Sequence, residues 1–243
     1  MKVLQLGNGG GFDIESTSSA FLIRPTDNTY ILFDCGWGIL AKLKDLHNDP
    51  TDNFTFDKID CVFISHMHED HIANLSTFIY YNYFIQKNFT NIIFEEDGPM
   101  YHKLDAYLDI CHSKLENGKV VATDMYELIE LYCGGNDTDY SLETIIGDHA
   151  TVPSSGLVIT TDTSFLYISG DTKATANIEE NVKHYQNKKR TTKLFHDYSN
   201  WDDPLNNVHA CKSDIASEYS KEFANQLIYY HTNTLFNQKW QDI

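Results

Sequence analysis

The sequence predicts an α/β fold in which two β-sheets lie between outer helices. Short apolar runs typical of strands occur in both halves of the 243-residue chain, and segments with helical spacing separate them. No low-complexity linker, internal repeat or change in composition divides the chain. We therefore expect a single domain over residues 1–243, with the strands gathered in two sheets and the helices outside them.

The first half of the chain reads mainly as strands, because β-branched and aromatic residues form its apolar runs. Its predicted elements are a strand at 2–6 that runs into glycines, a hairpin of strands at 20–24 and 30–34 that turns at Asp27-Asn28, a helix at 37–46, a buried strand at 59–64 and a helix that starts near Ile72. The glycines at 7–11 lack the Lys-Ser/Thr of a phosphate-binding P-loop. The glycines predict a turn. The alternative is that their backbone forms one wall of a binding site.

The middle of the chain, about 76–140, is predicted to be mostly helical and aromatic. The remaining predicted elements are strands at 143–148, 157–161 and 165–169, a helix at 174–187, a strand at 193–196, a helix at 213–225 and a strand at 227–231. Strands thus dominate each end of the chain, which favours two separate sheets.

The charge balance argues against two classes of partner. The chain has 18 basic and 35 acidic residues, a net charge of −17, so general nucleic-acid coating and adhesion to anionic membranes are disfavoured. No segment approaches the roughly 20 apolar residues that span a bilayer, and the N-terminus lacks the features of a signal peptide. The five cysteines are scattered without a Cys-x-x-Cys pair, so we expect a cytoplasmic protein without structural disulfides.

Histidines and carboxylates gather at the predicted ends of strands. The segment His66-Met67-His68-Glu69-Asp70-His71 follows a buried strand, and His149, Asp171 and His231 each follow another. Imidazole nitrogens and carboxylate oxygens suit zinc and similar divalent ions. Because ligands at the ends of adjacent strands share one rim of a sheet, the pattern predicts a metal site rather than a histidine-rich loop in solvent.

This His-x-His-x-Asp-His pattern, together with Phe33-Asp34-Cys35-Gly36 and Ser169-Gly170-Asp171-Thr172, resembles the metallo-β-lactamase fold superfamily. The resemblance implies a four-layer αββα sandwich with two divalent metal ions, most simply Zn²⁺, with Mn²⁺ as the alternative. It assigns one ion to His66, His68 and His149 and the second to Asp70, His71 and His231, with Asp171 as the bridge. Asp34 would orient a ligand without binding metal itself.

A second set of residues resembles the ribonuclease Z-type phosphodiesterase branch. This set comprises the segment from His149 through Ser154 and Ser155 to Gly156, the pair His196-Asp197, and His209-Ala210. The branch implies that His209, held by Asp197, helps catalysis, although the family has Glu where this chain has the shorter Asp197. His196 reads equally as a packed histidine, and the two serines either as phosphate contacts or as turn residues.

The implied chemistry is two-metal hydrolysis of a phosphodiester. Two ions activate a water, Asp70 orients it and accepts its proton, and protonated His209 serves the leaving oxygen. Only 171 − 149 = 22 positions separate His149 from Asp171, which leaves no room for the tRNA-gripping arm of ribonuclease Z enzymes. The armless pattern and the opening Gly-x-Gly-Gly-x-Phe-Asp look most like the anti-Pycsar proteins of phages, which implies a 3′,5′-cyclic mononucleotide as substrate.

Three other functions stay open from the sequence. A tRNA 3′-processing ribonuclease is favoured by a basic run that places five of the 18 basic residues in 11 positions, at Lys183, Lys188, Lys189, Arg190 and Lys193. A lactone or β-lactam hydrolase would use the same metals. A non-catalytic protein that sequesters a nucleotide would be expected to lose ligands, and here all are present.

An aromatic segment at 78–89 carries the prediction about partners. It holds six aromatic residues in 12 positions, and on a helix they would cover more than one face. We predict that this segment contributes to the core and to a homodimer interface, as is common in the branch that the chain resembles. The alternative is a platform on which a base stacks.

Overall fold

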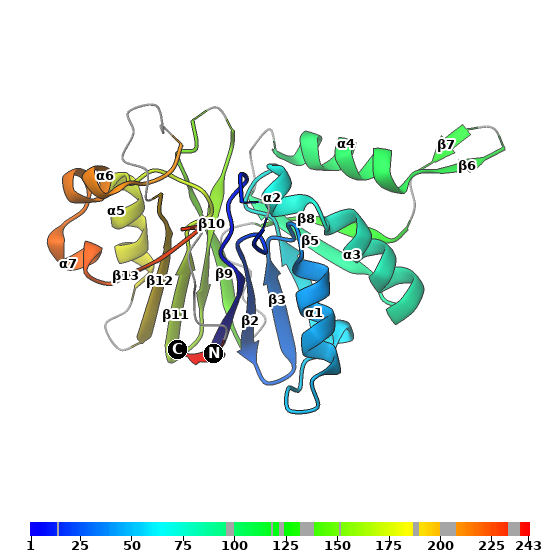
Figure 1. Cartoon of the computed structure of the whole chain (residues 1–243), viewed down its shortest axis with the longest axis horizontal. Helices are drawn as coiled ribbons and strands as arrows, with labels where there is room; N and C mark the ends of the chain where they lie inside the picture. The colour runs from blue at the N-terminus through cyan, green and yellow to red at the C-terminus, as the bar shows by residue number, and fades with distance from the viewer. Residues whose placement is uncertain are drawn as a thin grey trace.

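Two β-sheets lie face to face at the centre of the protein, and helices cover both outer faces (Figure 1). The computed structural model describes the chain except residues 14, 96–99, 118, 122–123, 132–138, 151, 187–189, 200–207 and 233–238. The two ends of the chain lie close together at the bottom of the view, where Ile243 donates a backbone hydrogen bond to Met1.

The first sheet has seven strands in the order β14-β1-β2-β3-β4-β5-β8. Their bounds are β1 Lys2–Gly7, β2 Ala20–Thr26, β3 Thr29–Phe33, β4 Ile59–Phe63, β5 Thr90–Glu95, β8 Tyr126–Leu131 and β14 Gln241–Asp242. The strands β1, β2 and β3 form antiparallel pairs, whereas β3, β4, β5 and β8 are parallel. The carboxyl ends of β3 and β4 therefore meet at the same edge.

The second sheet has five strands in the order β13-β12-β11-β10-β9. Their bounds are β9 Ser141–Ile146, β10 Ser155–Thr160, β11 Ser164–Ile168, β12 Thr191–Asp197 and β13 Leu227–Tyr230. Because β11, β12 and β13 are parallel and β10 is antiparallel to both of its neighbours, β9 and the parallel strands end at one edge.

Helices form the two outer layers of the sandwich. Beside the first sheet lie α1 Ile39–Asn48, the 3-10 turn η1 Phe56–Lys58, α2 Glu69–Ile72, α3 Leu75–Tyr81, the π-helical turn η2 Asn82–Gln86 and α4 Met100–His112. A small hairpin of β6 Lys114–Glu116 and β7 Lys119–Val121 follows α4 and projects away from the sheets (Figure 1). Beside the second sheet lie α5 Ala176–Tyr185, α6 Lys212–Glu218 and α7 Lys221–Ala224.

The buried apolar side chains fall into three clusters, one for each contact between layers. Alternation along β3 sends Ile31 into the cluster between the sheets and Leu32 into the cluster under α1 and α3. Along β10, Leu157 and Ile159 join the cluster between the sheets, and Val158 packs under the helices of the second sheet. Three contacts between layers require four layers, which is the αββα arrangement expected from the resemblance.

Most predicted elements are present near their expected positions, but the prediction for 76–140 is wrong in part. The strands β5 and β8 run through this region and extend the first sheet. The apolar run in β5 is short, and such a run does not distinguish a buried strand from a helix by its periodicity. The predicted helix at 213–225 is two helices, since the turn Tyr219-Ser220 separates α6 from α7.

The aromatic segment at 78–89 divides between core and surface. Phe78 is fully buried, whereas Tyr80, Phe84 and Phe89 are 37%, 50% and 58% exposed. The rings of Tyr80 and Phe84 are stacked with centroids 6.0 Å apart. The core half of the prediction is confirmed, and the homodimer stays a prediction.

Two further sequence expectations concern cysteines and the membrane. Among the described residues, Cys35, Cys61, Cys111 and Cys211 form no disulfide, and Cys133 lies outside the described residues. Among the helices that the structure describes, none combines the length and the apolar composition needed to cross a bilayer.

Candidate metal centre

The residues that were predicted as ligands come together at one edge of the sandwich, where both sheets end. His66 and His71 lie in the segment after β4 of the first sheet, and Asp171 and His231 follow β11 and β13 of the second. The ligand atoms fall into groups whose members all lie within 4.8 Å of one another. Each sheet therefore supplies part of the site, and the packing between the sheets fixes their separation.

The first group contains His66, His68, His149 and Asp171. His68 Nδ1 lies 3.0 Å from His66 Nε2 and 3.1 Å from His149 Nε2. His66 Nε2 lies 3.7 Å from Asp171 Oδ2. Ligands about 2.0–2.1 Å from a tetrahedral ion are about 3.3 Å apart, so this spacing suits one zinc-sized ion.

The second group contains Asp70, His71, Asp171 and His231. His71 Nε2 lies 3.4 Å from both Asp70 Oδ2 and Asp171 Oδ1, and His231 Nε2 lies 3.3 Å from Asp70 Oδ2. Because Asp171 belongs to both groups, its two oxygens can serve two ions. The structure thus brings together all seven predicted ligands.

Hydrogen bonds set the histidine tautomers that a metal requires. The Nδ1–H of His149 donates to the Val208 carbonyl at 2.8 Å, and the Nδ1–H of His71 donates to Asp34 at 2.7 Å. These bonds leave the Nε2 lone pairs of both rings directed toward the ligand groups. His71 Nε2 and Asp171 Oδ1 are buried and make no hydrogen bond within the described chain. A divalent ion accepts electron pairs from buried atoms of this kind. These residues therefore fit a metal site.

Asp34 lies behind the ligands, as predicted, and not among them. Its Oδ1 accepts the backbone N–H of Ser65 at 2.8 Å, and its Oδ2 accepts the Ser65 hydroxyl and the His71 ring N–H, each at 2.7 Å. The Ser65 oxygen in turn lies 3.1 Å from His66 Nδ1. Asp34 therefore orients one ligand directly and a second through Ser65, and its backbone is held in the left-handed region with φ 60°.

The pKa shifts of His66 and Asp171 suit metal binding, whereas nearby carboxylates more than offset burial and raise the pKa of His71 and His231. Burial lowers the pKa of His66 well below its usual value, which keeps the ring neutral. Burial acts to raise the pKa of Asp171, but His231 and His71 together hold it well below its usual range. Neutral imidazole and ionised carboxylate are the forms that coordinate a cation.

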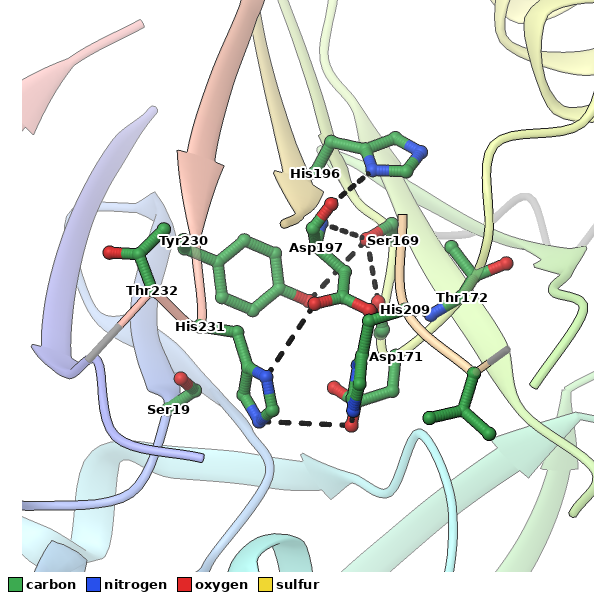
Figure 2. A network of polar contacts seen from close by, with 12 residues as sticks. Ser19, Ser169, Asp171, Thr172, His196, Asp197, His209, Tyr230, His231 and Thr232 are labelled. Atoms are coloured by element: carbon green, nitrogen blue, oxygen red, sulfur yellow. Dashed lines mark hydrogen bonds and ion pairs between the residues drawn. The ribbon is translucent and has the colours of Figure 1, made fainter. Parts of the chain in front are cut away.

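His209 lies beside the ligand groups and is held by Asp197 (Figure 2). Its Nδ1 lies 2.8 Å from Asp197 Oδ2, which also accepts the backbone N–H of Thr172 at 2.9 Å. Burial lowers the pKa of His209, but the Asp197 carboxylate more than offsets this and, with Asp171, raises it to about 9. Asp197 is thus long enough to make the pairing that the family makes with Glu.

Backbone bonds on both sides fix the segment that carries His209. The Val208 carbonyl accepts from the ligand His149, and the Ala210 N–H donates to the Thr172 carbonyl at 2.9 Å. The position of His209 is thereby tied to a ligand of the first group and to the strand end that carries Asp171.

His196 lies next to Asp197 in sequence but points away from the site. Its Nδ1–H donates to the Asp197 carbonyl at 2.7 Å, so its Nε2 accepts the Tyr219 hydroxyl at 2.7 Å. The ring is fully buried, and burial lowers its pKa. These contacts agree with the packed reading of His196.

Ser154 and Ser155 lie in the interior, at 2% and 0% exposure. Neither hydroxyl has a hydrogen-bond partner within the described chain. Ser154 Oγ lies 3.3 Å from the position that a Cβ would take at Gly170, just before Asp171. The two serines therefore lie next to the loop that carries Asp171. Their contact with a phosphate stays a prediction.

Sequence reasoning missed several residues that position the site. Ser65 and Asn8 each bond to a ligand or to a residue that orients one. Their residue types are common in loops, and no spacing rule marks them. Gly36 is required by close packing, since a Cβ there would lie 1.7 Å from the Asp70 carbonyl oxygen.

Comparison with known proteins supports the predicted resemblance. A sequence model of the family described as "Anti-Pycsar protein Apyc1" matches residues 1–242. Two proteins of that name, from the Bacillus phages vB_BsuM-Goe3 and vB_BveM-Goe7, are each 30% identical to the chain over 84 residues. Each match spans 35% of this chain and 30% of the phage protein.

Solved structures confirm the predicted metallo-β-lactamase fold. The short form of human tRNase Z superposes with a TM-score of 0.71 at 17% identity, covering 100% of this chain and 99% of that one. The metallo-β-lactamase fold protein YhfI from Bacillus subtilis superposes with a TM-score of 0.70 at 17% identity, covering 95% and 86%. At such identities the likeness establishes the fold alone.

Proposed function

Because the chain belongs to the anti-Pycsar Apyc1 family, we propose that it is a two-metal phosphodiesterase that opens 3′,5′-cyclic mononucleotides to linear monophosphates. One observation carries the proposal: two complete ligand groups share Asp171, and the paired histidine His209 lies beside them. A proton donor next to two cation sites is the arrangement that phosphodiester hydrolysis needs.

Two divalent ions held by these groups would supply an activated water and neutralise charge on the phosphate. The chain's own residues do the rest. Asp70, 3.3 Å from His231 and 3.4 Å from His71, orients the water and accepts its proton. Asp171 holds the two groups at a fixed separation. We favour zinc because five of the seven ligands are histidines, with manganese as the alternative.

In this proposal His209 donates a proton to the leaving oxygen. With a pKa raised to about 9, its ring is protonated at neutral pH. The bond from Nδ1 to Asp197 leaves the Nε2–H available to the substrate. When the ring of the cyclic phosphate opens, the Nε2 proton of His209 passes to the departing ribose oxygen. An unstable alkoxide is then not formed.

A small substrate is favoured over a folded RNA. Between His149 and Asp171, the described residues form only β10, β11 and their connections, so no described part of this segment could grip a distant part of an RNA. In the basic run, Lys183 pairs with Glu179 and Lys193 donates to Gln241 at 2.6 Å, while Lys188 and Lys189 lie outside the described residues. The net charge of −17 further opposes a polyanion.

The proposal places the enzyme in the cytoplasm of a phage-infected cell, where it would remove cyclic-nucleotide immune signals. It also includes a homodimer formed through the exposed side chains of Tyr80, Phe84 and Phe89. Large exposed aromatic side chains close together are typical of protein interfaces. Light scattering on the protein and on a Phe84→Glu variant tests this part, and a monomeric wild type would refute it.

A panel of substrates tests the activity. We expect metal-dependent turnover of at least one 3′,5′-cyclic mononucleotide and much weaker cleavage of precursor tRNA, compared as kcat/KM. Efficient 3′-end cleavage of precursor tRNA without ring opening would instead support a ribonuclease, and lactone hydrolysis a carbonyl hydrolase. Tight nucleotide binding without any turnover would support a sequestering protein.

A further inference from the structure

The residue Asn8 follows the first strand and reaches the far end of the chain. It lies in the glycine-rich segment after β1, and its side chain is buried, with 4% of the residue exposed. Its Oδ1 accepts the backbone N–H of His231 at 2.8 Å, and its Nδ2 donates to the Thr232 hydroxyl at 2.8 Å. One amide thus bonds to the backbone of His231 and to the side chain of Thr232.

A second amide fixes the orientation of the first. Gln5 Nε2 donates to Asn8 Oδ1 at 3.0 Å and to the Gly7 carbonyl at 3.1 Å. Because Asn8 Oδ1 receives two N–H donors, its oxygen and nitrogen cannot exchange places without losing bonds. The side chain is therefore preorganised before it meets His231.

His231 needs such support because its backbone conformation is unfavourable. Its φ of 64° lies in the left-handed region, which is unfavourable for a residue other than glycine. This conformation ends β13 abruptly and brings the ring to Asp70, with Nε2 at 3.3 Å from Oδ2. Without a restraint the backbone would relax toward the extended region, and the ring would leave the ligand group.

The glycine-rich segment after β1 also restricts the position of the His231 ring. A Cβ at Gly10 would lie 2.8 Å from His231 Cε1, closer than atoms can approach. The backbone of Gly10 therefore packs directly against the face of the imidazole. The segment restrains His231 twice, through the Asn8 bond to its backbone N–H and through contact with its ring.

We propose that Asn8 is a positioning residue that holds His231 in its metal-binding conformation. This inference rests on the two-metal site proposed above. It predicts that Asn8 controls the affinity of the ion held by Asp70, His71 and His231, and not of the ion held by His66, His68 and His149. Residues that orient a metal ligand typically change affinity by about 10–100-fold.

Zinc content measured by mass spectrometry after equilibration with graded chelator tests the inference without relying on activity. We expect Asn8→Ala to bind one ion as wild type does and the other about 10–100-fold more weakly. Asn8→Asp should recover most of the affinity, because its carboxylate can accept from both the His231 N–H and the Thr232 hydroxyl. Gly10→Ala should weaken the same ion by displacing the ring, without removing a hydrogen bond.

Asn82→Ala provides the matched control. Asn82 is also a buried asparagine, with 1% exposure, and it donates to the Phe89 carbonyl and to Thr90 far from the ligand groups. It should lower thermal stability and leave both ions bound. Unchanged binding in Asn8→Ala would overturn the inference alone, whatever Gly10→Ala shows, as would equal loss in Asn82→Ala. A wild type that takes up fewer than two ions would overturn the metal site, and the inference with it.

Discussion

The substitution Asp197→Asn removes one negative charge beside His209 and changes almost no volume. Asp197 is fully buried, and its Oδ2 accepts from both Thr172 and His209. An asparagine oxygen can still accept the Thr172 N–H, so the strand end should keep its structure. The main change is electrostatic, because a neutral amide no longer favours the protonated form of His209.

The size of the effect follows from the pKa of His209. Raising this pKa from the usual value of about 6.5 to about 9 corresponds to roughly 3 kcal/mol in favour of the protonated ring, since a tenfold change in that equilibrium is about 1.4 kcal/mol. Without Asp197 the pKa should fall to 6.5 or below, because burial still opposes the charge. At pH 7.5 about one ring in ten would then be protonated, so kcat should fall at least about tenfold.

The assay is the pH profile of kcat on a cyclic mononucleotide. In the wild type, kcat should decline as the pH rises through about 9, whereas in Asp197→Asn the decline should begin near 6.5. Asp27→Asn, at a side chain that is 97% exposed, is the matched control and should behave as wild type. A variant whose decline coincides with that of the wild type would refute the proposed role of the pair.

The same pair should affect stability with a defined sign. The pKa of His209 is higher in the folded chain than in the unfolded one, so its contribution is complete below about 6.5 and is lost as the pH rises through about 9. The free energy of unfolding should therefore fall over this range more in the wild type than in Asp197→Asn. Urea unfolding at several pH values measures the difference, and parallel curves would contradict it.

The other predictions concern metals, catalysis and packing. Purified protein reconstituted with zinc or manganese should hold two ions per chain, and elemental analysis that finds at most one would count against both ligand groups. His209→Ala should keep both ions and lose about 10²–10⁴-fold in kcat, less on a substrate with a good leaving group, and an unchanged rate would return His209 to a structural role. Asp34→Ala should weaken metal binding about 10–100-fold by releasing His71, as chelator competition would detect, and wild-type affinity would exclude this role. Tyr219→Phe should lower the free energy of unfolding by about 1–3 kcal/mol, because His196 loses its donor, while kcat stays within about twofold, and a large loss of kcat would give His196 a catalytic role.

The ligands were predictable because their chemistry and their position in the sequence agree. His149, Asp171 and His231 each follow an apolar strand, and carboxyl ends of parallel strands meet at one edge. Asn8 was not predictable in this way, because its role depends on packing between the two sheets. No local pattern records that β1 and β13 end beside each other.

The fold was predictable to a similar degree. The strands that flank the site are bounded by clear turns, so they were placed within a few residues. By contrast, β5 and β8 lie in an aromatic region where strand and helix compete, and β14 is only two residues long. The strands β8 and β14 are the two edges of the first sheet and β5 lies next to one edge, where tertiary contacts decide the structure.

The bond between Asn8 and His231 joins residues 223 positions apart, and this separation bears on how the enzyme matures. At about 5–20 residues per second, a ribosome needs roughly 10–45 s to make the intervening chain. Within this stretch His66, His68 and His71 are made first, His149 and Asp171 follow about 80–100 residues later, and His231 is made last. An ion captured by this nascent segment would have an incomplete set of ligands and would exchange readily. In the two-metal proposal, the ion held by Asp70, His71 and His231 would therefore load stably only after His231 is made and the two sheets have closed on each other.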